Sequence, residues 1–174
     1  MTQPSSAPPC RSAEPSLTVV PYSHPEARRL TWELHAEQAS VYGFADAPDD
    51  TPARDFELPR GLFVIARTHG ASEAVGCGGW RLLTPQTAEI KRMYVAASAR
   101  GQGLGRQILS FLEDEAAAHG VTQLVLETGA RNHSALTLYR NSGYLPRTPY
   151  VSGRDTSVNR AMTKTLFHTG LNRR

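Results

Sequence analysis

A loop rich in glycine and arginine holds the residues whose types and spacing most directly suggest chemistry. It reads Arg100-Gly101-Gln102-Gly103-Leu104-Gly105-Arg106. The segment before it is predicted as a strand and the segment after it as a helix. Glycines let backbone N–H groups approach an anion closely, and the first turn of a helix adds unpaired donors and the positive end of the helix dipole. The loop therefore predicts a binding site for a phosphate or diphosphate group, with a simple tight turn as the alternative.

Two arginines strengthen the anion-binding interpretation. Arg100 and Arg106 flank the predicted start of the helix, and the first acidic residue of that helix is Glu113. A cation at a helix N-terminus is unfavourable by about 0.3–1 kcal/mol, and a bound anion would reverse that sign. The loop lacks the Gly-Lys-Ser/Thr ending of a Walker loop, and its place in the chain differs from that of the dinucleotide fingerprint.

Two glutamates are candidates for proton transfer. Glu89 lies on the predicted strand that leads to the loop, six residues before Val95. A carboxylate on a central strand is expected to have a raised pKa, which suits a general base. The alternative for Glu89 is a structural ion pair with Arg81 or Arg92. Glu127, near the end of the next predicted strand, is the second candidate, either as the base or as the group that binds a substrate ammonium.

The elements that must position these residues follow from hydrophobic periodicity and turn residues. Predicted strands cover residues 17–20, 62–66, 74–83, 88–95 and 121–127, and the last strands lie around residue 144 and over residues 158–166. Predicted helices cover residues 24–42, 103–119 and 132–141, and the acidic stretch 44–60 is predicted as a loop with one short helical turn. The order βαβββαβαβ predicts one α/β sheet, largely antiparallel, with helices on both faces.

Length and composition are typical of one globular domain with a tail. The chain has 174 residues, of which 40% are hydrophobic and 20% charged. Residues 1–16, half of them Pro or Ser, are predicted as a flexible tail, residues 17–167 as the domain and residues 168–174 as a C-terminal tail. No apolar run has the length of a membrane helix and the N-terminus does not resemble a signal peptide, which predicts a cytoplasmic protein without membrane contact.

The remaining composition argues against several other classes of protein. Cys10 and Cys77 form no disulfide framework or zinc motif, and the six histidines show no metal-ligand spacing, so no metal is expected. The net charge is +3, and residues 129–174 carry eight basic side chains against one acidic. Since there is no arginine or lysine run and no aromatic ladder, this basic part favours a phosphorylated ligand over nucleic acid, with scattered solvated charges as the alternative.

Two motifs of this chain resemble those of the GNAT superfamily of acetyl-coenzyme A-dependent N-acetyltransferases. Arg100-x-x-Gly103-x-Gly105 resembles the family's loop for the coenzyme pyrophosphate, and it follows a strand, residues 89–95, that resembles the family's fourth strand. Residues 132–144, Asn-x-x-Ala-x-x-Leu-Tyr-x-x-x-Gly-Tyr, resemble its second conserved motif. The resemblance extends over residues 17–166, and short segments within it are similar to a bacterial subgroup that acts on small-molecule or peptide amines.

This resemblance implies a fold and a co-substrate. The fold is α/β of the α+β type: one domain with a mixed, mostly antiparallel sheet of six to seven strands, flanked by helices, and a V-shaped splay between the fourth and fifth strands. The co-substrate is acetyl-CoA. The residues expected to bind it are Met93, Tyr94, Val95, Arg100, Gly101, Gln102, Gly103, Leu104, Gly105, Arg106, Asn132, Ala135 and Tyr139. The backbone of residues 93–95 is expected to pair with the pantetheine arm as an added strand, and the Val95 N–H to polarise the thioester carbonyl.

The resemblance also implies catalytic roles. Glu89 is expected to be the general base and Tyr139 the general acid that protonates the leaving thiolate, in a direct transfer without an acyl-enzyme. The alternatives are a core position for Tyr139 and a simple helix N-cap for Asn132. Glu127 and Trp80 are expected to contact the acceptor, although Trp80 also suits a core position.

The acceptor is expected to be an amine of a small molecule or a peptide. The acidic stretch at residues 46–57 predicts that this amine belongs to a cationic molecule. Gly76, Gly78 and Gly79 lie in one predicted strand and indicate a bulge or a close approach of substrate. The alternatives are a non-catalytic acyl-CoA-binding or sensor module, a protein N-terminal or lysine acetyltransferase and, third, a nucleic-acid-binding module. The resemblance is compatible with a homodimer.

Overall fold

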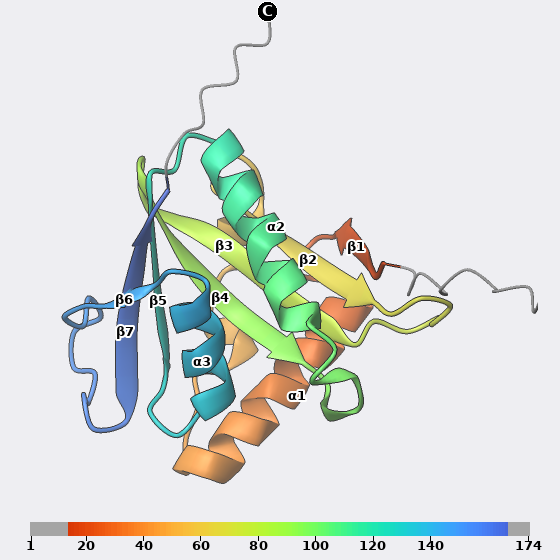
Figure 1. Ribbon diagram of the computed structural model, residues 1–174, viewed down its shortest axis with the longest axis horizontal. Coiled ribbons are helices and arrows are strands. Elements are labelled where there is room, and N and C mark those ends of the chain that lie inside the picture. Colours follow the sequence, from red (N-terminus) through yellow and green to blue (C-terminus); the bar gives the residue numbers. More distant parts are fainter. Residues whose placement is uncertain (1–13, 167–174) are drawn as a thin grey trace, which may run out of the picture.

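The structure is a computed structural model that describes residues 14–166 (Figure 1). The strands are β1 (Ser16–Val19), β2 (Gly61–Arg67), β3 (Gly76–Thr84), β4 (Thr87–Val95), β5 (Gln123–Gly129), β6 (Leu145–Pro146) and β7 (Asn159–Thr165). The helices are α1 (Pro25–Tyr42), α2 (Leu104–Ala118) and α3 (His133–Asn141). Three short 3-10 helices are η1 (Pro48–Asp50), η2 (Ala53–Phe56) and η3 (Ala97–Ala99). The tails predicted at residues 1–13 and 168–174 lie outside the described residues.

The seven strands form one sheet in the order β1-β2-β3-β4-β5-β7-β6. Only β4 and β5 pair in parallel, and every other neighbouring pair is antiparallel. Parallel neighbours need a crossover connection, and α2 supplies it between β4 and β5. The predicted sheet, mixed and mostly antiparallel with flanking helices, is therefore confirmed.

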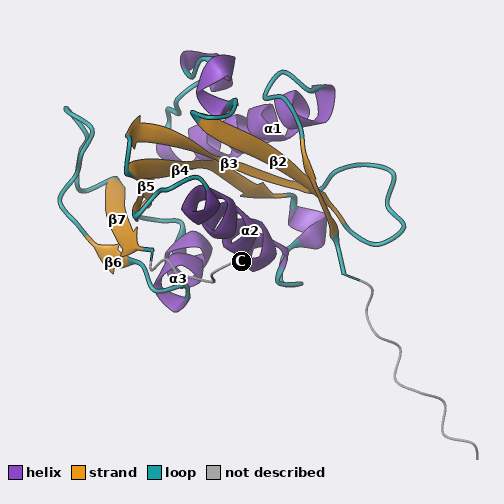
Figure 2. Ribbon diagram, turned by 90° about the horizontal axis from the view of Figure 1, so that it is seen from above, coloured by secondary structure: helices purple, strands orange, loops and turns teal. Residues whose placement is uncertain are grey.

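Helices cover both faces of the sheet, with α2 and α3 on one face and α1 on the other (Figure 2). The apolar stripe of α2 buries Leu104, Ile108 and Leu112 against strands β2 to β5. On the opposite face α1 buries Ala27 and Leu30 in a second core. One face of the sheet thus packs against α2 and the other against α1, and successive side chains along β4 and β5 point alternately to these two faces.

The middle of the sheet is split between β4 and β5. These strands are hydrogen-bonded only at their beginnings, where residues 87–89 pair with residues 123–125. β4 then continues to Val95 and β5 to Gly129 while the two diverge (Figure 1). This divergence is the V-shaped splay implied by the resemblance, and it leaves backbone edges free in the centre of the molecule.

A bulge on β4 lies beside the split. Arg92 has a φ of 60°, and it is the only non-glycine residue of positive φ within residues 14–166. The register of β3 and β4 shifts here, between Cys77 and Gly79. Lys91 and Arg92 are neighbours in sequence, yet both line the same cavity described below. Bulges commonly re-aim side chains in this way.

The strand glycines confirm the predicted bulge but do not serve a substrate. A Cβ added at Gly78 would lie 2.6 Å from the Met93 sulfur, and one at Gly79 would lie 2.7 Å from the Phe63 ring. The close approach that these glycines permit is therefore internal packing of the two cores. Two smaller differences concern element bounds: β1 begins at Ser16, inside the predicted tail, and the acidic stretch forms η1 and η2 instead of one helical turn.

Candidate functional site

The glycine loop presents unpaired backbone donors at the start of α2. Gly101 and Gly103 have φ values of 77° and 79°, which glycine adopts without the steric strain that a side chain would add. Gly103 caps α2 in the left-handed conformation without any side-chain cap. The first N–H groups of α2 are thus free of side-chain acceptors and lie where the helix dipole is positive. The local geometry suits a phosphate group.

The two flanking arginines differ in their partners. The Arg100 Nε donates to the Val95 carbonyl at 2.8 Å, and its Nη2 pairs with the Glu37 carboxylate of α1. Arg106 makes no ion pair or hydrogen bond with any other side chain in the described range, and it lines a cavity beside the loop. Arg100 therefore fastens the loop to β4 and α1, whereas Arg106 is the cation that remains for a ligand.

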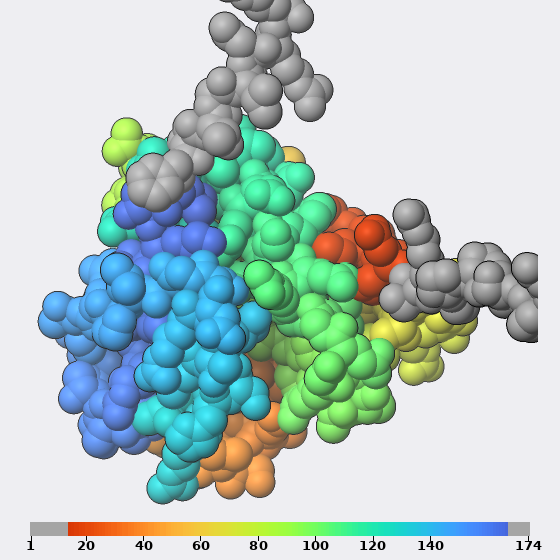
Figure 3. Space-filling view, viewed as in Figure 1, coloured from red at the N-terminus to blue at the C-terminus, as the bar shows by residue number. Residues whose placement is uncertain are grey.

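This cavity, of about 420 Å³, is bounded by the glycine loop, the end of β4 and α3. The Ala96 N–H donates to Val75, next to β3. Because backbone groups alternate along a strand, the N–H groups of Val95 and Met93 face the split instead. The surface is hollowed between the green loop region and the blue-green helix α3 (Figure 3). An extended ligand in this hollow would find free strand donors.

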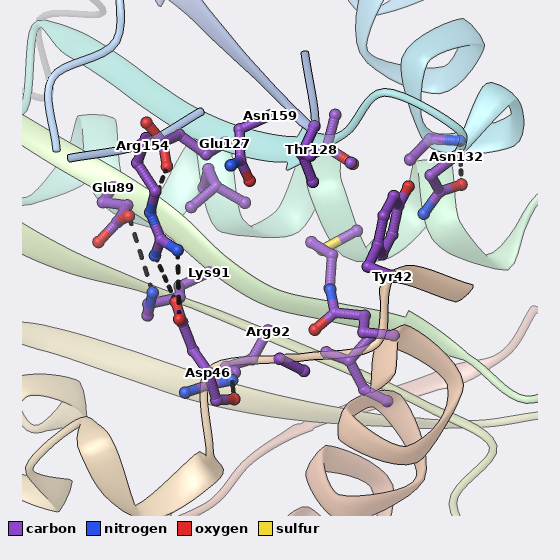
Figure 4. Close-up of a pocket in the computed structure, with 18 of the residues that line it drawn as sticks. Tyr42, Asp46, Glu89, Lys91, Arg92, Glu127, Thr128, Asn132, Arg154 and Asn159 are labelled. Carbon is purple, nitrogen blue, oxygen red and sulfur yellow. Dashed lines mark hydrogen bonds and ion pairs between the residues drawn. The ribbon is translucent and has the colours of Figure 1, made fainter. Parts of the chain in front are cut away.

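A second cavity, of about 140 Å³, adjoins the first on the side of α1. Three acidic and three basic residues are among those that line it: Asp46, Glu89, Glu127, Lys91, Arg92 and Arg154. Figure 4 shows these side chains converging from β4, β5 and two loops. Five residues line both cavities, so that the two cavities meet at the split: Leu34, Met93, Asn132, Ala135 and Tyr139.

Glu89 is 4% exposed and its two carboxylate oxygens have separate partners. The Arg81 Nε donates to Oε2 at 2.8 Å, and the Tyr150 hydroxyl donates to Oε1 at 2.9 Å. The Lys91 ammonium lies 3.9 Å from Oε1. The structure thus contains the ion pair with Arg81 that the sequence offered as the alternative to a catalytic role, and it also leaves Glu89 on the wall of the cavity.

Glu127 is less completely paired than Glu89. The Arg154 Nε lies 3.2 Å from Oε2, within ion-pair distance but not in hydrogen-bonding geometry. Oε1 is buried without any hydrogen-bond partner in the described range. Burial raises the pKa of this carboxyl above its usual value, while the charge of Arg154 opposes the rise. Glu127 therefore has the raised pKa expected of a proton acceptor.

Arg154 joins two loops across the mouth of this cavity. It lies in the segment between β6 and β7, and its guanidinium binds both carboxylate oxygens of Asp46, which follows α1 (Figure 4). That pairing holds the pKa of Asp46 below its usual range. Sequence reasoning missed Arg154, Lys91 and Tyr150, because a lone residue on a loop or strand carries no motif.

Tyr139 of α3 lies at the junction of the two cavities and is 5% exposed. Its ring packs edge-on against Tyr144 with centroids 5.6 Å apart. Burial raises its pKa above the usual value, so the phenol stays protonated at neutral pH. Both interpretations of Tyr139 therefore apply together: it is part of the core, and its ring reaches the cavities.

Two further predicted residues have clear positions. The Asn132 side chain accepts from the Ala135 N–H at 3.1 Å as the N-cap of α3, and it also lines both cavities. Trp80 is 0% exposed and packs in the α2 core. It lines neither cavity because its position on β3 faces α2, which agrees with the core position that the sequence offered as the alternative.

Neither a metal-binding cluster nor a membrane-spanning helix occurs in the part of the chain that the structure describes. Within residues 14–166, no group of three or more His, Cys, Asp or Glu side chains is placed to hold a metal ion. In the same range no helix is both long and apolar enough to cross a membrane.

The fold thus places two adjoining cavities at the split in the sheet, one beside the glycine loop and one lined by charged residues. Comparison with known proteins identifies the class of protein. The sequence profile described as "Acetyltransferase (GNAT) family" matches residues 25–144. The chain belongs to this family, which confirms the resemblance found in its motifs.

Individual relatives agree with this assignment. An "IAA acetyltransferase" of Azospirillum brasilense is 42% identical over 89 residues, 51% of this chain and 57% of that protein. The match thus spans little more than half of that relative. A Klebsiella pneumoniae structure assigned as an acyl-CoA N-acyltransferase has a TM-score of 0.74 and 29% identity, covering 88% of this chain and 98% of that one. A GNAT acetyltransferase from Elizabethkingia anophelis with acetyl-CoA bound shares the fold, with a TM-score of 0.62, 20% identity and coverage of 87% and 98%.

Proposed function

We propose that the protein transfers the acetyl group of acetyl-CoA directly to a primary amine of a small molecule or peptide. The observation that carries this proposal is the meeting of two cavities at the split between β4 and β5. One has the free donors of the glycine loop, and the other has carboxylates suited to accept a proton. A structure of the same fold contains acetyl-CoA, which supports this choice of co-substrate.

The chain offers a hold for each part of the coenzyme. The N–H groups at the start of α2, together with Arg106, would bind the pyrophosphate. The free edge at Met93 and Val95 would pair with the pantetheine arm, and the Val95 N–H would stabilise charge on the carbonyl oxygen. Asn132 and Ala135 would complete the wall on the side of α3.

Proton transfer is assigned to two residues. An alkylammonium has a pKa near 10, so the amine must lose a proton before its nitrogen bonds to the acetyl carbon. In our proposal Glu89 accepts that proton as general base. Tyr139 donates its proton to the thiolate released when the carbon–sulfur bond breaks. Its buried, protonated phenol at the junction of the cavities supports this role.

One observation favours Glu127 as the base instead. Both oxygens of Glu89 accept strong donors, whereas Oε1 of Glu127 has no hydrogen-bond partner in the described range and burial raises the pKa of Glu127. The two assignments differ in measurable consequences. Of Glu89→Gln and Glu127→Gln, the variant that removes the base should lower kcat by about 100-fold or more and abolish the rise of rate with pH. The variant at the other glutamate should mainly raise the KM of the acceptor.

The first experiment is a calorimetric titration with acetyl-CoA, with S-acetylpantetheine as the control that lacks the phosphates. Micromolar binding that requires the phosphates would support the proposal, and absence of binding would contradict it. Release of CoA in the presence of amines then separates an enzyme from a non-catalytic acyl-CoA-binding module, which would bind tightly without turnover. Peptide and protein amines in the same assay test the alternative of a protein N-terminal or lysine acetyltransferase.

A further inference from the structure

The charged residues of the smaller cavity are nearly all paired with one another. The Arg92 terminal nitrogens donate to the carbonyls of Asp46 and Ala47 at 2.9 and 2.7 Å. Arg154 binds Asp46 and lies against Glu127. Each terminal nitrogen of the two arginines already donates to a contact that shapes the cavity, whereas the Nε of each is buried without a hydrogen-bond partner in the described range.

Besides these two Nε atoms, two groups of opposite charge on facing strands lack a full partner. The Lys91 ammonium makes no hydrogen bond with any described residue, and the carboxylate oxygen paired with it is 3.9 Å away. The Glu127 Oε1 is buried and has no hydrogen-bond partner in the same range. The Lys91 side chain is 18% exposed, so its ammonium is within reach of a ligand, and a buried carboxylate oxygen without a partner is unfavourable and commonly marks a place where a ligand binds.

These two groups lie on opposite sides of the split. Glu89 is in register with Val125 where β4 and β5 still pair. Lys91 and Glu127 lie two residues further along β4 and β5, and they line the same cavity from its two sides (Figure 4). A ligand placed between the strands would therefore meet a cation on the β4 side and a carboxylate on the β5 side.

The acidic stretch that predicted a cationic acceptor contributes a single carboxylate to the cavity, that of Asp46, and three of its acidic residues are in ion pairs. Asp46 pairs with Arg154, Asp49 with Arg28, and Asp55 with both Arg60 and Arg81. The lining of the cavity carries equal numbers of acidic and basic residues. A molecule with an amine and an anionic group matches this balance better than a cationic molecule does.

We propose that the acceptor carries a carboxylate beside its reacting amine, as a free amino acid does, and that Lys91 binds this carboxylate while Glu127 receives the amine. This inference rests on the proposed acetyl transfer and specifies its substrate class. Lys91 is then a specificity-determining residue. Burial lowers the pKa of its ammonium, which a bound carboxylate would counteract.

The test compares acceptors that differ only in the carboxylate. α-Amino acids are assayed with acetyl-CoA beside their α-amides and their decarboxylated amines, and CoA release gives kcat/KM per neutral amine, because the three amines differ in pKa. We expect the wild-type protein to prefer the amino acid by about 10- to 100-fold, the range typical of a hydrogen-bonded ion pair. We expect Lys91→Met to bring this ratio close to one and Lys91→Arg to retain most of it.

The chain offers a matched control in its second lysine. Lys164 pairs with Glu113 on the far side of the sheet and lines neither cavity. Lys164→Met should therefore keep the wild-type preference. Thermal unfolding and acetyl-CoA titration of each variant establish that it is folded. A wild-type ratio near one, or a ratio that Lys91→Met leaves unchanged, overturns the inference while acetyl transfer itself stands.

Failure of the proposed function would give a different result, namely no CoA release with any acceptor. In that case the amino acids are titrated into the protein saturated with CoA. Binding that is at least about tenfold weaker in Lys91→Met supports the carboxylate site independently of catalysis. Absence of binding by the wild-type protein overturns the site together with the function.

Discussion

At the scale of single residues, the two glutamates of the site differ in how their folded environment treats negative charge. Glu89 accepts hydrogen bonds from Arg81 and Tyr150, whereas burial makes the charged form of Glu127 unfavourable. Functional sites typically hold a carboxyl group whose ionised form is unfavourable in the folded protein, because such sites sacrifice some stability for activity. This difference has a consequence for stability that is separate from catalysis.

We expect Glu127→Gln to be at least as stable as the wild-type protein at neutral pH. Because the pKa of Glu127 is raised above its unfolded value of 4.5, the wild-type protein loses stability as the pH rises from 4.5 through the folded-state pKa. The variant lacks this titration. Its melting temperature relative to wild type should therefore rise between pH 4 and pH 7, by about 2 °C, in thermal unfolding scans. A melting-temperature difference between variant and wild type that falls from pH 4 to pH 7 would contradict this expectation.

Tyr139→Phe should lower kcat by about 100-fold while acetyl-CoA still binds, because the change removes only the proton donor at the junction of the cavities. In the wild-type protein the raised pKa of Tyr139 keeps the phenol protonated. Its ionisation should therefore cause no loss of rate below about pH 10, the usual pKa of tyrosine. Steady-state kinetics with calorimetric binding measure both quantities. Unchanged turnover in the variant would exclude the proposed role.

At the scale of elements, the start of α2 depends on backbone conformation more than on side chains. Gly101 and Gly103 adopt positive φ values with open space where a Cβ would be. The glycines are therefore needed for the turn itself and for access by a ligand, and no neighbouring side chain excludes a larger residue. A substitution in this loop therefore affects the backbone turn and ligand access, without the clash against neighbouring side chains that a substitution commonly adds.

Gly103→Asp should abolish acetyl-CoA binding, because it adds both bulk and negative charge where the pyrophosphate is expected. Gly70→Asp provides the matched control, since Gly70 has a φ of 74° and no atom within 4 Å of its Cβ position, and it lies in the turn between β2 and β3, away from both cavities. The two variants carry the same backbone strain, of about 1–2 kcal/mol at most. Isothermal titration should show normal binding for Gly70→Asp alone, and equal loss in both would indicate a folding defect.

The elements themselves were largely predictable from sequence, whereas the acceptor side of the site was not. Hydrophobic periodicity and turn residues located α1, α2 and α3 to within a few residues, since each has an apolar stripe and a glycine near its end. The cofactor side follows from one contiguous stretch of chain. Arg154 and Asp46 meet through a separation of more than a hundred residues, and only the fold brings them together. Of the partners of Glu89, the sequence offered only Arg81, which lies opposite it on the neighbouring strand, and not Tyr150.

At the scale of the whole molecule, the sheet is discontinuous at its centre. β4 and β5 are both central strands, yet past residues 89 and 125 nothing in the described chain pairs one with the other. A ligand that inserts there would join the two halves of the sheet. It would stabilise the native state in proportion to its occupancy, because it binds the folded and not the unfolded chain.

Acetyl-CoA at 100 times its Kd should stabilise the protein by about 2.7 kcal/mol and raise the melting temperature by about 5–10 °C. The shift should grow with the logarithm of the ligand concentration. S-acetylpantetheine should produce a much smaller shift at equal concentration, and Gly103→Asp should show no shift with acetyl-CoA. A wild-type melting temperature that does not respond to acetyl-CoA would contradict the proposed binding site. Differential scanning fluorimetry measures all of these.

The two cavities also differ in how the chain builds them, and this bears on how the protein could diversify. The cavity proposed for the coenzyme is formed mainly by the continuous run from Met93 to Arg106 with α3, whereas the cavity proposed for the acceptor joins the segment after α1 to the segment before β7. Substitutions and insertions in those two loops would remodel one ligand site and leave the other intact. A lineage with this architecture can therefore exchange acceptors by loop evolution while it inherits the same acyl donor unchanged.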